Sequence, residues 1–161
     1  MVAGQVGVLA TAGIVGAGIR WWTHSPVNHA IFDVGDGWCV SAEPHGAALR
    51  RITDFPPAVW SEFVYPTDTA RSAAILWALN AIGTPYGFLD DAALAIVLAF
   101  GWSAPQFVLD RLARTDRLQC AQLCDLALQA GNIHAFDDGR PPSLVWPGLF
   151  YTLYRAKHWA P

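Results

Sequence analysis

Residues 28–47 have the sequence NHAIFDVGDGWCVSAEPHGA, and the prediction of the fold begins with them. This stretch contains two β-rich runs separated by Gly35-Asp36-Gly37. Three-residue loops that contain glycine commonly join antiparallel strands, so the stretch predicts a β-hairpin. With these three residues as the loop, Val34 lies opposite Trp38, and this pair sets the register of the whole hairpin.

The same count brings polar side chains of the two strands together. It places His29 opposite Glu43, and Ser41 opposite Ile31, one diagonal step from His29. Directly opposed side chains share a face, with Cβ atoms about 5 Å apart. A histidine beside a carboxylate is typical of a general base with its orienting group, and equally of a surface cross-strand pair without function. Cys39 is assigned to the opposite face, in the core.

The rest of the chain changes character near residue 66. Strands followed by helices, rather than alternating with them, predict an α+β fold, here in a single domain that is β-rich over 1–66 and helical over 67–161. Strands are predicted over 6–11, 27–34, 38–43, 48–53 and 62–66. Helices are predicted over 68–82, 89–100, 106–114, 119–130 and 147–155.

Composition excludes several classes of protein. The chain has 161 residues, of which 53% are hydrophobic and 14% charged, and its net charge is −3. Such a chain is not disordered, and its ten basic residues form no stripe for nucleic acid. Three irregularly spaced cysteines make no disulfide framework. We expect an apolar surface that a partner covers.

Two apolar segments resemble membrane signals. Residues 2–19 lack a preceding basic residue and are interrupted by glycines, so they do not predict a secretory signal. Residues 92–100 are too short to span a bilayer, which takes about 20 residues. The expectation is therefore a chain without a transmembrane segment, cytoplasmic or associated with a virion.

Cys120 is the candidate nucleophile. It stands near the start of the predicted helix, where the helix dipole and unpaired N–H groups favour a thiolate, and Arg117 lies one turn earlier. The alternative is a structural role. Cys120, Leu123, Cys124 and Ala127 follow the i, i+3, i+4, i+7 pattern of a buried helix face, and free cysteine is often a small core residue.

Other chemistries find less support in the sequence. Cys120 and Cys124 lie one turn apart, but no CxxC or HxxxH motif completes a zinc site, so no metal or other cofactor is expected. Ser25 and Ser41 lie outside any GxSxG motif, which argues against a serine hydrolase.

Three fragments taken together resemble a known family. Residues 28–47 are similar to the hairpin of permuted NlpC-type papain-fold cysteine enzymes, AIGTPYGF at 81–88 resembles the family's G-x-P-Y segment, and CAQLC at 120–124 resembles its nucleophile helix. The order is that of the permuted members, which include relatives of lecithin:retinol acyltransferase: histidine comes before cysteine. PPSLVWPGLF at 141–150 resembles a closing element of such domains.

The resemblance implies an antiparallel sheet packed on a nucleophile-bearing helix. The 33 residues between Tyr86 and Cys120, rich in Ala and Leu, depart from the family's pattern and predict an inserted helical pair. The resemblance implies that Cys120 is the nucleophile and His29 the base, and that Tyr86 and Gln119 belong to the oxyanion or substrate site. We therefore expect the start of the Cys120 helix to pack against the His29 hairpin, with Tyr86 nearby.

The chain also departs from the family's pattern. By alignment, the family's orienting glutamate falls at Ser41, whereas Glu43 lies two residues further along the same face. A serine usually follows the nucleophile, and Ala121 stands there instead. A carboxylate stabilises an imidazolium and a hydroxyl does not, so Glu43 is the preferred third catalytic residue and Ser41 the alternative.

The implied function is a cysteine amide hydrolase that cleaves peptide amides in peptidoglycan, in cell-wall remodelling or in a phage tail or lysin. A lipid acyltransferase or thioesterase of the permuted branch is the second hypothesis. The third is a non-catalytic component of a virion or tail that keeps the fold and binds a protein partner.

Overall fold

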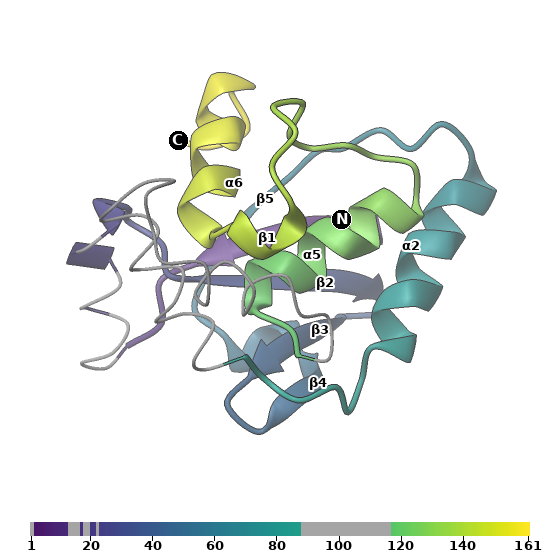
Figure 1. Ribbon diagram of the computed structural model, residues 1–161, viewed down its shortest axis with the longest axis horizontal. Helices are drawn as coiled ribbons and strands as arrows, with labels where there is room; N and C mark the ends of the chain where they lie inside the picture. Colours follow the sequence, from purple (N-terminus) through teal and green to yellow (C-terminus); the bar gives the residue numbers. More distant parts are fainter. Residues whose placement is uncertain (1, 13–16, 18–19, 22, 88–116) are drawn as a thin grey trace.

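The computed structural model describes residues 2–12, 17, 20, 21, 23–87 and 117–161. Its centre is a five-stranded antiparallel sheet in the order β4-β3-β2-β1-β5 (Figure 1). The strands are β1 (Val6–Leu9), β2 (His29–Gly35), β3 (Trp38–Glu43), β4 (Gly46–Arg51) and β5 (Val59–Trp60). A short 3₁₀ turn, η1 (Ile52–Asp54), follows β4.

Within the described residues, three helices follow the strands, as expected for an α+β chain. They are α2 (Asp68–Asn80), α5 (Cys120–Ala130) and α6 (Pro147–Ala156), and the 3₁₀ turn η3 (Pro142–Leu144) precedes the last. The Thr67 hydroxyl caps α2 by accepting the Ala70 N–H at 3.0 Å. The predicted helices over 89–100 and 106–114 lie outside the described residues.

The hairpin differs from the prediction at its turn, and the predicted pairing of His29 with Glu43 is absent, because the paired register of the two strands ends at Ile31 and Ser41. The turn is the two-residue Asp36-Gly37, and a bulge between Asp33 and Gly35 absorbs the extra residue. Because the shorter loop and the bulge compensate each other, Ile31 still pairs with Ser41, as predicted. Asp36 and Gly37 have φ of +52° and +77°, as a type I′ hairpin turn requires.

The sheet separates two hydrophobic clusters. The main core lies between the helices and one sheet face, and the β2 residues Ala30 and Phe32 contribute to it. A smaller cluster on the other face contains Leu9, Ile31 and Cys39, covered by Ile52, Phe55, Ala58 and Trp60. Alternate residues of a strand point to opposite faces, and this rule decides on which side each candidate site residue lies.

One predicted strand is wrong. Residues 62–66 form no strand, and the edge strand is Val59–Trp60 instead, paired with Gly7 and Val8 of β1. Trp60 stacks against Gly7, where a Cβ would approach its ring to 2.9 Å. Among the described residues, no helix has the length and apolar character needed to cross a membrane.

Candidate functional site

Cys120 is the first residue of α5, and Gln119 is its N-cap residue. The side chain of Gln122 accepts the backbone N–H of Gln119 at 3.2 Å, which fixes the first turn of the helix. Both Gln119 and Cys120 are buried. Within the described part of the chain, the Nε2 of Gln119 has no hydrogen-bond acceptor. An unused buried donor is costly, so its position directly before Cys120 needs an explanation.

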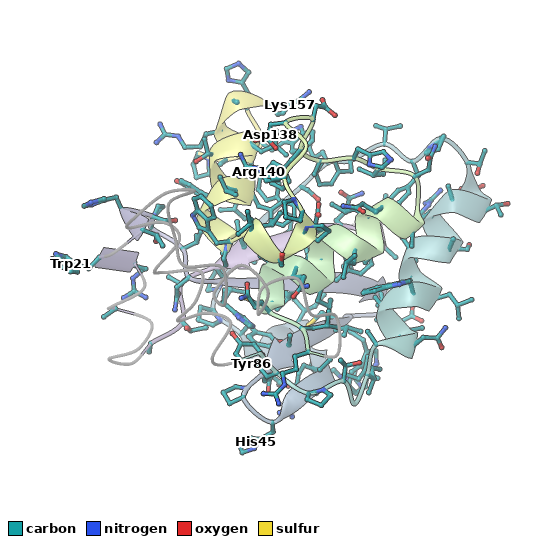
Figure 2. The ribbon with its side chains drawn as sticks, viewed as in Figure 1. Trp21, His45, Tyr86, Asp138, Arg140 and Lys157 are labelled. Atoms are coloured by element: carbon teal, nitrogen blue, oxygen red, sulfur yellow. The ribbon has the colours of Figure 1, made fainter. Side chains whose placement is uncertain are left out.

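Tyr86 is held next to the start of α5 by the backbone. Tyr86 forms an isolated parallel β-bridge with Leu118, and the Leu118 N–H donates a hydrogen bond to the Pro85 carbonyl at 3.0 Å. Figure 2 shows Tyr86 beneath this end of α5. The predicted proximity of Tyr86 to the Cys120 helix is therefore observed.

His29 is the first residue of β2 and contacts Ser41 directly. The distance from His29 Nε2 to Ser41 Oγ is 2.9 Å, and the imidazole ring lies 5.8 Å from the ring of Phe55. The paired ladder of β2 and β3 ends at Ile31 and Ser41, so His29 has no direct cross-strand partner in β3. Ser41, not Glu43, is the immediate neighbour of the imidazole.

Glu43 forms the next part of the same polar cluster. Arg50 holds its carboxylate with two nitrogens, at 3.0 Å from Nε and 2.7 Å from Nη2. This bond lowers the pKa of Glu43, and the positive charge of Arg50 lowers it further, although burial acts in the opposite direction. Glu43 therefore stays ionised, and it lies on the same face of β3 as Ser41, two residues away.

Burial controls the protonation of His29. The side chain is half-buried, and loss of solvation lowers its pKa to about 4, although the nearby charge of Glu43 acts in the opposite direction. The imidazole is therefore neutral at neutral pH. A neutral imidazole can accept a proton, as a general base must.

The side chains of Cys120 and His29 lie on opposite sides of the sheet. Cys120 packs in the main core with Ala30 and Phe32, whereas the contact with Phe55 places the His29 ring on the side of the smaller cluster. As expected, α5 packs against β2 and β3. A contact between the imidazole and the thiol, however, has to pass round the end of the sheet, where β2 begins.

The other two cysteines are core residues, as predicted. Cys39 and Cys124 are fully buried; burial raises the pKa of Cys39 to about 12 and that of Cys124 well above its usual value. The predicted face of Cys39 is wrong. Cys39 shares the face of Ser41 and Glu43, because residues two apart in a strand point the same way.

Sequence reasoning missed two residues of the cluster, Arg50 and Phe55. Arg50 pairs with Cys39 across β3 and β4, and it reaches Glu43 along a face where the intervening residues, Ala48 and Gly46, are small. Opposite charges on neighbouring strands were a usable signal for Arg50. Phe55 follows η1, and its contact with His29 depends on tertiary packing that no local pattern indicates.

All five histidines of the chain lie in the described residues. His45 is exposed in the turn between β3 and β4, and in Figure 2 it points away from the molecule. Across the described ranges, no group of three or more His, Cys, Asp or Glu side chains could hold a metal ion. His29 is thus the histidine that the fold holds in a polar cluster at the end of the sheet.

Compared with protein-family models, with curated proteins and with solved structures, the chain matches none.

Proposed function

We propose that the protein is a cysteine amide hydrolase of the permuted papain-like kind, with Cys120 as nucleophile and His29 as base. The observation that carries the proposal is the hydrogen bond between His29 Nε2 and Ser41. It orients a neutral imidazole at the end of the sheet and leaves Nδ1 without a hydrogen bond to any other described residue. That nitrogen is the one available to a thiol.

The reaction would proceed through an acyl-enzyme. The mechanism requires the Cys120 thiol to reach His29 round the end of the sheet where β2 begins. Nδ1 of His29 then takes the thiol proton, and the thiolate attacks the amide carbonyl. The C–N bond then breaks, and the imidazolium returns its proton to the leaving amine. Water, deprotonated by His29, hydrolyses the thioester and releases the acid.

Gln119 gives the tetrahedral intermediate a donor. The first N–H groups of a helix have no intrahelical acceptor, and the unused Nε2 of Gln119 adds a side-chain donor at the same place. Donors aimed at a developing oxyanion lower the barrier. The substrate that the resemblance favours is a peptide amide of peptidoglycan.

The test is the rate at which iodoacetamide labels each cysteine at pH 6, followed by mass spectrometry. We expect Cys120 to react at least about tenfold faster than the buried Cys39 and Cys124, since a positioned base typically accelerates reactions by 10²–10⁴. His29→Ala should remove this advantage. His45→Ala, at an exposed position in the turn between β3 and β4, is the matched control and should leave it unchanged.

Peptidoglycan supplies the second readout. The protein should release soluble fragments with new amino termini from purified sacculi, and Cys120→Ala should abolish the release. If Cys120 is labelled selectively but no fragments are released, Cys120 remains the proposed nucleophile and peptidoglycan is rejected as the substrate. Equal, slow labelling of all three cysteines would reject the enzyme.

The second candidate function is a non-catalytic component of a virion or tail. The observation in its favour is the separation of Cys120 and His29 onto two faces of the sheet. Trp21 and Val64 are 74% and 87% exposed and offer apolar contacts to a partner. In this case the Cys120→Ala and His29→Ala variants would still assemble with the partner, and neither substitution would lower any hydrolytic activity.

A further inference from the structure

We propose that the groove between the loop 23–26 and α6 binds a small ring compound that carries one anionic group. Arg155 binds the anionic group, and the ring lies against Trp146 and the aromatic side chain beside it. Neither Cys120 nor His29 lines the groove. The proposal therefore goes beyond the hydrolase and does not depend on it.

The groove follows one face of α6. Gly148, Thr152 and Ala156 line it, and residues four apart in a helix share a face. These eight residues correspond to a length of about 12 Å. The loop 23–26 forms the other wall, and it comes so close that a Cβ on Gly148 would meet the Oγ of Ser25 at 2.7 Å. The volume of about 580 Å³ is that of a small-molecule site, about 300–1,000 Å³.

The two segments of the chain that form the groove have no acidic side chain. All 13 Asp and Glu residues lie from Asp33 to Asp138, so residues 1–32 and 139–161 contain none. The same two segments contain three arginines and one lysine. This part of the surface is therefore positive in a chain whose net charge is −3, and charge complementarity favours an anion as its ligand.

Arg155 supplies a guanidinium that no carboxylate of the described residues binds. The side chains of Arg50, Arg71 and Arg140 each form an ion pair. Arg155 lines the groove, and its side chain has neither an ion pair nor a hydrogen bond within the described part of the chain. A guanidinium holds its N–H donors in a planar fork that fits a carboxylate or a phosphate. Arg155 thus selects the kind of anion as well as its charge.

The aromatic side chains favour a ring over a simple ion. Trp146 and Tyr151 are half-buried and line the groove. The Nε1 of Trp146 lies 3.1 Å from the position that a Cβ of Gly148 would take, and among the described residues it has no acceptor. An indole has flat apolar faces and one N–H donor. Trp146 is therefore suited to contact a ring and to donate to a polar substituent on it.

The experiment titrates the full-length protein, labelled with ¹⁵N at tryptophan, at pH 7. The indole N–H signal of Trp146 is identified by its loss in Trp146→Phe. The probes are 3-phenylpropionate and 2-phenylethyl phosphate, in which a short spacer separates the ring from the anion. We expect at least one of them to shift the Trp146 signal saturably, and the tighter of the two identifies the anionic group.

Two partial analogues separate the contributions of charge and ring. The neutral 3-phenylpropanamide lacks the charge, and propionate lacks the ring. Each should bind at least about tenfold more weakly than 3-phenylpropionate if the carboxylate is the preferred anion, because a hydrogen bond to a charged group contributes about that factor. If the phosphate is preferred, 2-phenylethanol and inorganic phosphate are the corresponding analogues.

Substitutions locate the site. Arg155→Gln should weaken binding by at least about tenfold, and Thr152→Leu should weaken it as well, because it fills the floor of the groove without changing the charge. Both positions are exposed, so the fold should tolerate these changes. Lys157→Gln is the matched control. It removes the same charge at the end of α6 (Figure 2), outside the groove, and should leave the affinity within about twofold.

Three results would overturn the proposal. They are a Trp146 signal that neither anion shifts, a partial analogue that binds as tightly as the complete probe, and an Arg155→Gln protein with the affinity of the wild type. None of these results bears on whether Cys120 is a nucleophile, so the groove and the hydrolase are tested separately.

Discussion

At His29, burial and charge act in opposite directions on one titratable group. Burial lowers its pKa from 6.5 to about 4, and the carboxylate of Glu43 limits the shift. The folded protein therefore binds fewer protons than the unfolded chain between these two pH values. By linkage, the stability that the neutral imidazole contributes is complete above pH 6.5 and is lost as the pH falls through that interval.

We therefore predict a pH-dependent difference between the wild type and His29→Gln. From pH 7 to pH 4.5, the wild type should lose up to about 3 kcal/mol of unfolding free energy relative to the variant. Burial raises the pKa of Asp125 to about 6, so protonation of this residue increases the unfolding free energy as the pH falls. This effect is present in both proteins and does not change the difference between them. Urea denaturation across this range measures the gap, and a constant gap would contradict the assignment.

At the scale of elements, the hairpin turn fixes the register on which the cluster depends. Gly37 has a φ of +77°, and a Cβ added there would meet no atom within 4 Å. Replacing it therefore tests backbone conformation alone. Left-handed φ costs an ordinary residue about 1–2 kcal/mol, and asparagine less.

We accordingly predict that Gly37→Ala lowers the unfolding free energy by about 1 kcal/mol and that Gly37→Asn lowers it by clearly less. Chemical denaturation of the two variants is the measurement. Equal losses would show that the turn does not have the type I′ conformation.

At the scale of the whole molecule, Tyr154 joins the two ends of the chain. Its hydroxyl donates to the backbone carbonyl of Val6 at 3.1 Å, and its ring lies fully buried among Phe63, Phe150 and Trp159. Burial raises the pKa of Tyr154 well above its usual value. One side chain thus fastens α6 to β1.

Two substitutions should separate the contributions of this residue. Tyr154→Phe removes only the hydrogen bond and should cost about 1 kcal/mol. Tyr154→Ala also leaves a cavity in the core and should cost about 3–5 kcal/mol. Tyr151→Phe, on the same helix but half-buried, is the control and should be nearly neutral; a Tyr154→Phe protein as unstable as Tyr154→Ala would contradict this division.

Local signals in the sequence determined most of the elements. The Gly35-Asp36-Gly37 signal predicted the hairpin, and the pairing of Ile31 with Ser41 followed by counting. Helix caps predicted α2, α5 and α6 to within a few residues. These features depend on contacts between neighbours in the chain, so their signals lie in short stretches of residues.

Which polar groups contact one another depends on the tertiary structure. In the folded protein, Glu43 forms an ion pair with Arg50, His29 forms a hydrogen bond with Ser41, and Cys120 packs in the main core. A bulge and a two-residue turn are indistinguishable from a longer loop in sequence, and the face that each strand residue occupies depends on what packs above and below the sheet. The relation between the thiol and the imidazole is such a long-range property, because it depends on how α5 lies over a sheet formed from residues far away in the chain.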